Sequence, residues 1–452
     1  NTDVLIIDAS KGFIKEGKNN KLRASDIKRI ADTFIKRESV AKFSRVVSRE
    51  EIRSNDYNLN IPRYVDSSEA AEHWDVYASM FGGIPTAEID EMSEFWTAFP
   101  ALKKALFTES GIPYVNVSTP DIKSAIKSHP DVVGFENAFN AAFSTFPAFL
   151  KEELIDRMGS IEISKAETVL SADIFERLKD IPLIDKYAAF QLLDDDWTGI
   201  SIDLEMLQTE GFAATKKVDP NLVIKKKDGK DQEVQEGWVG HIIPFDLVQA
   251  TLLSAETDEL HGLESRLAEI PSEYESILDE MTEEDKESCN DVLTEEGDAF
   301  VPKEVSKKIK ELKKDRSPES VALRTLLEKV ESLVKSEKEI KAEIKAKSAA
   351  LQAKTKDTIE RLSDEQALDL LEKKWIAPLI ESIHKLPDTV IDSLVSKIQA
   401  LQNKYATTFF EVEQQISETE ATLSGMIDDL EGNEYDMLGL NELKKLLGGS
   451  AE

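Results

Sequence analysis

The chain has 452 residues, of which 41% are hydrophobic, and a formal net charge of −32. A chain of this length and composition folds into two or three globular domains, and its charge excludes a protein that coats nucleic acid along its whole length. No apolar run reaches the roughly 18 residues that a membrane helix needs. The single cysteine, Cys289, excludes an internal disulfide, so we expect a cytoplasmic protein without membrane contact.

The charge is unevenly distributed. Residues 1–65 contain 14 Lys and Arg and 9 Asp and Glu, a net charge of +5, so the remainder carries −37. A basic start on an acidic chain favours one local contact with an anion over a general affinity for polyanions.

The chain opens on an apolar, β-branched run, Val4–Ile7. Such a run is typical of a strand that is buried on both faces of a parallel sheet. Residues 43–47 alternate like an exposed strand, and no nearby run is a convincing ladder partner for the first one. Because a buried strand needs partners and residue 1 is Asn, we expect the C-terminal part of a larger protein.

Local signals predict the next elements. Ser25 can cap a helix whose apolar face is Ile27, Ile30, Ala31 and Phe34. The Ser48–Glu51 tetrapeptide is a capping box, and residues 57–65 are expected to be extended. Residues 67–157 are predicted to be helical, and residues 221–238 to form a hairpin around Asp228-Gly229.

Two long helical segments follow beyond residue 301. Apolar residues recur every third or fourth position in both, which is typical of a coiled coil. A break is expected between them, near Pro378. We predict that these seams bind a partner helix, through Leu326, Val330, Leu333, Ile340, Ile344, Leu394, Ile398, Leu401, Val412 and Ile416.

The sequence contains no recognisable catalytic constellation. Its five histidines include no i, i+4 pair for zinc, and it has no glycine-rich nucleotide motif and no nucleophile elbow. Asp194–Asp196 is interpreted as a solvated turn or helix start rather than a cation site, and Trp238 and His241 as packing residues. We therefore predict no catalytic, cofactor-binding or metal-binding residue.

A basic loop lies between the predicted strand and the first helix. Its cations could contact the phosphates of DNA without reading sequence, or could simply keep a loop soluble. The residues alone favour neither interpretation. The DNA-contact candidates are Lys11, Lys15, Lys18, Lys21 and Arg23.

The first 65 residues carry a resemblance to a known family. Val4 to Ser10, the polar loop up to Arg23, Asp26-Ile27, Phe43–Ser48 and Tyr57–Val65 together resemble the methylation subunit of type I restriction-modification systems. Weaker likenesses are Phe95–Leu102 and Gly237–Phe245. Asn60-Ile61-Pro62-Arg63-Tyr64 is not the catalytic N-P-P-Y/F motif of amino-methyltransferases, because it lacks the first proline and contains an arginine.

The resemblance implies a function for the whole subunit. Members of the family transfer a methyl group from S-adenosylmethionine to the N6 atom of adenine in double-stranded DNA, using a Rossmann-like domain. Their partners are a specificity subunit and a restriction subunit. Their glycine-rich and N-P-P-F motifs do not occur in this sequence, so the chain alone is expected to be inactive and to bind no cofactor.

The sequence therefore predicts a mainly α protein. Residues 1–66 would be the C-terminal remnant of the methyltransferase sheet, residues 67–300 a helical domain with a small hairpin, and residues 301–452 a coiled coil for assembly or self-association. The alternative is a non-catalytic helical scaffold or interaction protein. It explains the seams and the acidity equally well, but it does not explain the ordered likeness over residues 4–65.

Overall fold

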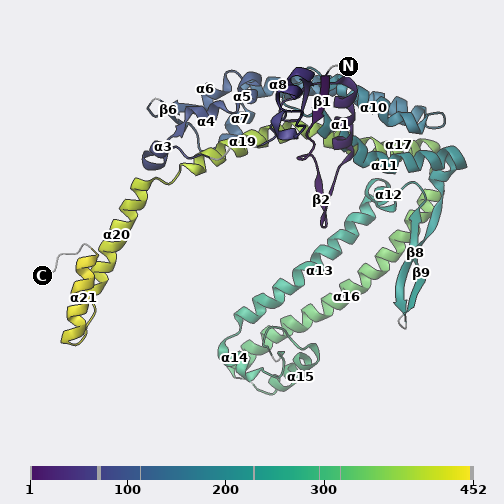
Figure 1. The fold of residues 1–452 in the computed structure, drawn as a ribbon. Coiled ribbons are helices and arrows are strands. Elements are labelled where there is room, and N and C mark those ends of the chain that lie inside the picture. Colours follow the sequence, from purple (N-terminus) through teal and green to yellow (C-terminus); the bar gives the residue numbers. More distant parts are fainter. Residues whose placement is uncertain are drawn as a thin grey trace. The chain divides into compact units, whose positions relative to one another are not determined.

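The computed structural model describes residues 3–68, 73–111, 113–227, 230–294, 296–315 and 317–447. The chain is mainly helical, as predicted. It divides into two units, each assembled from separate stretches of sequence. Unit 1 contains residues 1–152, 162–200 and 378–452, and unit 2 contains residues 153–161 and 201–377. Figure 1 shows the elements of both.

Unit 1 begins with a small α/β head, residues 3–68. Strand β1 (Asp3–Ile7) pairs antiparallel with β4 (Ser44–Ser48), with Val4 opposite Val47. The expectation that no nearby run pairs with the first strand was wrong, because the segment predicted as an exposed strand is that partner. Val47 is fully buried, and Ile6 packs beside it in the core of the head.

Helix α1 (Ala24–Lys36) turns the opposite way from the prediction. Its cap is Arg23 rather than Ser25, and Ile27 and Phe34 of the predicted inner face are 55% and 66% exposed. Ser25 is buried instead, and its N–H donates to the side chain of Gln191 at 3.0 Å. The helix therefore packs on unit 1 with its polar face.

The predicted basic loop contains a hairpin. Strands β2 (Ile14–Glu16) and β3 (Asn19–Lys21) pair antiparallel around Gly17 and Lys18. Gly17 has a φ of 61°, a left-handed conformation that glycine adopts without steric cost in such a two-residue turn. The hairpin extends away from β1 and α1 (Figure 1).

One of the two hydrogen bonds of the predicted capping box at Ser48–Glu51 is confirmed. Ser48 caps α2 (Arg49–Ser54) by accepting from the N–H of Glu51, whereas the Glu51 carboxylate pairs with Arg45 instead of reaching back. The prediction of an extended segment over residues 57–65 was wrong, because a 3-10 turn, η1 (Ile61–Arg63), interrupts it. This turn buries Tyr64 in the head.

Short helices and a small sheet continue unit 1. Strands β5 (Ile84–Pro85), β7 (Tyr114–Val117) and β6 (Phe107–Glu109) form an antiparallel sheet that the sequence did not predict, because two to four residues are too few to show alternation. The helices are α3 (Val76–Phe81), α4 (Thr86–Asp90), α5 (Ser93–Ala98), α6 (Leu102–Leu106), α7 (Ile122–Lys127), α8 (Pro130–Phe143), α9 (Phe146–Leu150), α10 (Ile163–Leu178) and α11 (Lys186–Glu210).

The C-terminal segment returns to close the core of unit 1. It forms α18 (Ala377–His384), α19 (Leu386–Lys404), α20 (Phe409–Asp428) and α21 (Glu434–Leu446). Leu394 and Ile398 of α19 are fully buried in one cluster with Ile89 and Phe99. At the end of α19, the hydroxyl of Tyr405 and the ammonium of Lys404 both donate to buried Glu88.

Unit 2 contains the predicted hairpin and a pair of long helices. After η2 (Lys151–Asp156) and η3 (Phe212–Lys216), strands β8 (Val218–Lys227) and β9 (Lys230–Gly240) pair antiparallel; the predicted Asp228-Gly229 turn lies outside the described residues. The helices are α12 (Phe245–Leu252), α13 (Ser254–Glu280), α14 (Glu283–Ser288), α15 (Pro302–Leu312), α16 (Pro318–Glu360) and α17 (Asp364–Trp375). In Figure 1, α13 and α16 run side by side.

These units differ from the predicted domains at 1–66, 67–300 and 301–452. Helix α16 pairs with α13 across residue 300, and α19 belongs to the core of unit 1. The predicted break near Pro378 is confirmed, because Ile376 separates α17 from α18. Asp194–Asp196 lie inside α11 rather than in a turn or at a helix start.

The turn after β9 is held by polar contacts. Gly240 approaches its surroundings so closely that an added Cβ would lie 1.7 Å from the carbonyl oxygen of Ile243. His241 contacts Asp219 through Nδ1 at 2.6 Å and Glu210 through Nε2 at 3.1 Å. The hydrogen bond to Asp219 and then that to Glu210 raise the pKa of His241, against the effect of burial. The Trp238 ring lies 4.0 Å from the Lys356 ammonium.

The raised pKa of His241 makes the stability of unit 2 depend on pH. Charged His241 is stabilised in the folded state, so its contribution is complete below the ordinary histidine pKa of about 6.5 and is lost as pH rises through the folded value. We expect the free energy of unfolding to fall as the pH rises above about 6.5. The His241→Gln variant should lose this component in urea titrations; an identical pH dependence in the variant would contradict the assignment.

Candidate nucleic-acid interface

The β2–β3 hairpin presents cations to solvent. Lys15, Lys18 and Lys21 are all exposed. The ammonium of Lys21 is paired with Glu16 at 2.9 Å, whereas no ion pair within the described residues involves Lys15 or Lys18. Two neighbouring lysine side chains without a carboxylate partner can neutralise phosphates and release the cations condensed on DNA, which is how backbone contacts to DNA gain affinity.

Arg23 has a structural role at the start of α1. Its guanidinium Nε donates to Asp26 at 3.1 Å, and its backbone N–H donates to the same carboxylate at 3.0 Å. Burial opposes ionisation of Asp26, but the hydrogen bonds from Arg23 outweigh it and hold the pKa of Asp26 below its ordinary value. Most of the charge of Arg23 is therefore compensated within the head.

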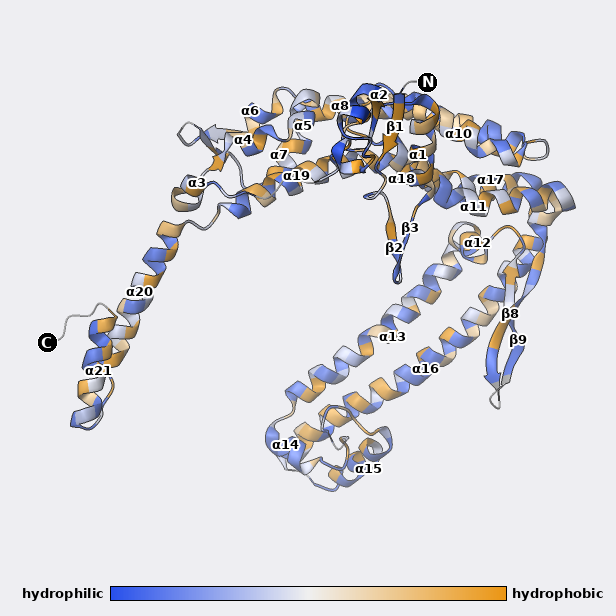
Figure 2. Cartoon of the chain, viewed as in Figure 1, coloured by the Kyte–Doolittle hydropathy of each residue, from blue (hydrophilic) through white to orange (hydrophobic). Residues whose placement is uncertain are grey.

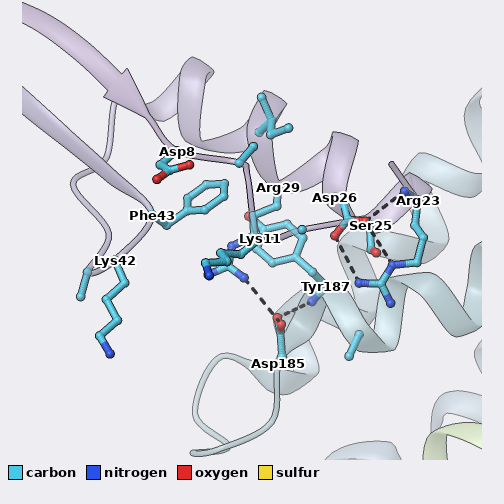
Figure 3. A pocket seen from close by; sticks show the side chains of 15 residues that line it. Asp8, Lys11, Arg23, Ser25, Asp26, Arg29, Lys42, Phe43, Asp185 and Tyr187 are labelled. Carbon is cyan, nitrogen blue, oxygen red and sulfur yellow. Dashed lines mark hydrogen bonds and ion pairs between the residues drawn. The ribbon is translucent and has the colours of Figure 1, made fainter. Parts of the chain in front are cut away.

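A cleft of about 340 Å³ lies beside the base of the hairpin. Lys11, Lys42, Arg29 and Phe43 line it from the head, and Asp185 and Tyr187 line it from the loop before α11 and its first turn (Figure 3). The Arg29 guanidinium lies 4.5 Å from the centre of the Phe43 ring and 3.9 Å from the Asp185 carboxylate. Cation–π contacts of this kind stabilise by about 0.5–2 kcal/mol.

The carboxylates at this cleft already have donors. Asp8 accepts hydrogen bonds from Ser10 and then Ser67, which lower its pKa, and Asp26 is held by Arg23. Asp185 contacts Arg29. Lys11 and Lys42 form no ion pair within the part of the chain that the structure describes, although the charge of Lys11 helps to lower the pKa of Asp8. The lining has four cationic side chains and three carboxylates, so its net charge is positive. The arrangement suits an anion.

Polar contacts of α1 fix the position of the head. Lys28 lies over the rings of Phe175 and Phe190, at 5.2 and 5.6 Å from their centres. The phenol of Tyr187 donates to Asp32 at 3.3 Å. Burial, and next the charge of Asp32, raise the pKa of Tyr187 to about 12, so this phenol stays protonated and keeps donating at neutral pH.

The structure thus brings Lys11 together with three residues that the sequence did not single out, namely Arg29, Lys42 and Phe43. Arg29 and Lys42 were part of the basic excess of the head, but nothing in the local pattern distinguishes them. Their shared cleft arises because α1 docks on residues some 150 positions later, such as Tyr187 and Gln191. That contact leaves no trace in a window of neighbouring residues.

The predicted partner-binding residues range from fully buried to exposed. Val330, Leu394 and Ile398 are fully buried within their own units, and Leu326, Leu333, Ile344 and Leu401 pack against the same or similar clusters. Ile340 is half-buried. Val412 and Ile416 on α20 are 38% and 53% exposed. Partner binding stays a prediction for all ten, but only the last two present a largely accessible side chain.

Two kinds of feature are absent from the described residues. These residues contain no group of three or more His, Cys, Asp or Glu side chains that could hold a metal ion. None of their helices is both long and apolar enough to cross a membrane.

Comparisons with known proteins match the start of the chain. Residues 1–73 match the family of N-6 DNA methylases. The chain is 36% identical over 73 residues to the methylase subunit of the type I restriction enzyme MpnII of Mycoplasma pneumoniae. It is 42% and 41% identical over 76 residues to the methylase subunits of the type I enzymes MjaVII and MjaVIII of Methanocaldococcus jannaschii.

Each match covers 16% of this chain, and the chain spans only about 13% of the length of each of these relatives. No solved structure matches the chain. The resemblance drawn from residues 4–65 is confirmed over the first 73 residues, which are similar to the methylase subunits of type I restriction enzymes.

Proposed function

Since the first 73 residues are similar to type I methylase subunits, we propose that this chain serves DNA contact and subunit assembly within the methylation subunit of a type I restriction-modification enzyme. The parent enzyme would transfer a methyl group from S-adenosylmethionine to adenine N6 in double-stranded DNA. The head would be the end of its Rossmann-like sheet. The observation that carries the DNA-contact role is the uncompensated positive charge of the β2–β3 hairpin and the adjoining cleft.

The cleft does not fit the two cationic groups of S-adenosylmethionine. The cofactor carries a sulfonium, an ammonium and a carboxylate group, and its two cations need free carboxylates or backbone carbonyls near them. In the cleft, Asp26 and Asp185 are already paired with arginines and Asp8 is held by Ser10 and Ser67, whereas Lys11 and Lys42 form no ion pair within the described residues. These two ammonium groups repel the sulfonium and the ammonium of the cofactor. We therefore assign no cofactor contact to this chain.

The proposal predicts that this chain alone does not catalyse methyl transfer. Purified chain alone is expected to transfer no label from S-adenosylmethionine to duplex DNA, because its sequence contains neither the glycine-rich motif nor the N-P-P-F motif. The measurement is incorporation of a labelled methyl group into DNA above a protein-free background. Robust incorporation would contradict this part of the proposal.

The DNA contact can be tested with two lysines of the hairpin. At ~0.1 M salt, each phosphate contact contributes roughly a tenfold factor in affinity through counterion release. We expect the Lys15→Ala/Lys18→Ala variant to bind a fluorescent DNA duplex at least roughly tenfold more weakly than the unaltered chain in anisotropy titrations.

The matched control removes two exposed lysines of α16, as Lys335→Ala/Lys338→Ala. It changes the net charge by the same amount and should leave affinity within about twofold, because remote surface charges are screened at this salt concentration. Equal losses in both double variants would show that the hairpin has no specific role.

The assembly role is supported by α20 and α21. Hydrophobic and hydrophilic residues intersperse along both helices (Figure 2), and α20 exposes Val412, Ile416, Leu423 and Met426. The sequence between Lys404 and Lys444 contains ten Asp and Glu and no Lys, Arg or His. A second copy of this surface would repel the first, so the charge favours a different, basic helical partner, which we assign to the specificity subunit.

This assignment predicts the effect of placing charge on the apolar face of α20. The Ile416→Glu/Leu423→Glu variant should weaken co-purification with the specificity subunit at least roughly tenfold, because each buried apolar side chain contributes about 1.5–3 kcal/mol. The control, Gln414→Glu/Ala421→Glu, adds two glutamates at the same spacing on another face of the helix and should bind normally. Unchanged co-purification of the first variant would exclude this face as the contact.

A further inference from the structure

Helix α15 directly follows a strongly acidic segment of the chain. Residues 254–301 contain 17 Asp and Glu and only two Lys and Arg, whereas residues 302–314 contain six lysines and two glutamates. The basic segment forms α15 and the two residues after it, and it lies at the end of the α13–α16 pair in unit 2 (Figure 1). The acidic body predicted from composition therefore has a local basic surface.

Four of these lysines share one face. Lys303, Lys307 and Lys310 follow one another at spacings of four and three residues, which places them in a row on α15, and Lys314 continues this spacing in the turn directly after the helix; we call these four lysines the α15 ridge. All four side chains are exposed. Val305 and Ile309 lie on the opposite face, where they are buried against α16.

The ridge is only partly neutralised by its surroundings. Lys307 pairs with Glu304 at 2.8 Å, and Lys308, which lies off the ridge, pairs with Asp291 at 3.1 Å. Lys303, Lys310 and Lys314 form no ion pair within the described residues. Lys303 and Lys310 are seven residues apart, or roughly 10 Å along the helix axis, so the ridge presents positive charge over several ångströms.

The composition of this surface distinguishes between partners. Among the described residues of 302–315, no large apolar side chain is exposed. Protein interfaces bury an apolar or aromatic centre and are depleted in lysine, whereas interfaces with DNA are polar and strongly positive. A row of lysines without apolar neighbours fits a phosphate backbone better than it fits an acidic protein surface.

We propose that the α15 ridge is a second contact for the sugar–phosphate backbone of double-stranded DNA, separate from the hairpin of the head. The choice of duplex DNA rests on the proposed function, but the ridge itself does not. Because lysines are flexible point charges that contact phosphates, we expect the contact to depend little on sequence. The acidic α13 and α14 repel the same backbone, which confines the contact to the ridge.

Lysine footprinting of the full chain tests the two contacts separately. The chain is acetylated at low salt with and without a DNA duplex of random sequence, and the modification of each lysine is measured by mass spectrometry. We expect DNA to lower the reactivity of Lys303, Lys310 and Lys314 severalfold, while Lys335 and Lys338 of α16 stay unchanged as internal controls.

The head lysines are measured in the same experiment, so the two proposals have separate outcomes. Protection of Lys15 and Lys18 without protection of the ridge would overturn the second contact and leave the proposed function standing. Protection of the ridge alone would support the second contact and contradict the role of the hairpin. Ridge protection that grows with protein concentration in the absence of DNA would identify another copy of the chain as the partner and overturn the inference.

A triple variant adds a measurement of affinity. Lys303→Ala/Lys310→Ala/Lys314→Ala keeps the helix, because alanine has the highest helix propensity and the buried face is untouched. It should bind the duplex at least roughly tenfold more weakly at ~0.1 M salt, with an unchanged circular dichroism spectrum. Full affinity in a folded triple variant would overturn the inference.

Discussion

The position of the head depends on the polar face of α1. Arg29 lies between the Phe43 ring and the Asp185 carboxylate, Ser25 donates to Gln191, and Tyr187 donates to Asp32. Apart from the contact between Arg29 and Phe43, which lies within the head, each contact joins the head to α11 or to the residue just before it. Because these contacts use the polar side of α1, the helix exposes Ile27 and Phe34, and the cleft forms where the head meets α11. The candidate DNA contact is a product of this docking.

A second set of contacts closes unit 1 on its C-terminal segment. Buried Glu88 accepts from both Lys404 and Tyr405, and a carboxylate without partners at this depth would cost several kcal/mol. Helix α19 adds Leu394 and Ile398 to the same core as Ile89. These contacts hold the end of α19, from which the chain continues into the acidic, partly apolar helices α20 and α21.

The sequence predicted local structure better than it predicted contacts between distant segments. Local patterns of a few neighbouring residues were enough to predict strand β1, the Ser48 cap, the break before Pro378 and the long helices. The orientation of α1 was wrong, because aromatic rings on α10 and α11 receive its charged side chains and override its amphipathic pattern. The sequence also did not predict that α16 pairs with α13. The apolar spacing of α16 indicates that the helix packs against another helix, but it does not identify that helix.

The same limit applies to the candidate site. Lys15 and Lys18 could be singled out because they crowd one short stretch, whereas Arg29, Lys42 and Phe43 gain their importance only from the cleft that α11 completes. The α15 ridge was hidden for a different reason. A net charge averaged over a long acidic region does not reveal a short helix with several lysines on one face. The burial of Val305 and Ile309 shows which face of α15 packs inward and therefore which face carries the lysines.

The central claim is that an acidic chain binds DNA through a few local cations. The salt dependence of the affinity of the full chain for duplex DNA tests it most directly, because the slope of log K against log salt counts the phosphate contacts at about −0.9 for each. If the two lysines of the hairpin, the two of the cleft and the three of the α15 ridge that form no ion pair each contact a phosphate, the slope is roughly −6. A slope near zero, or no binding at low salt, would contradict the account.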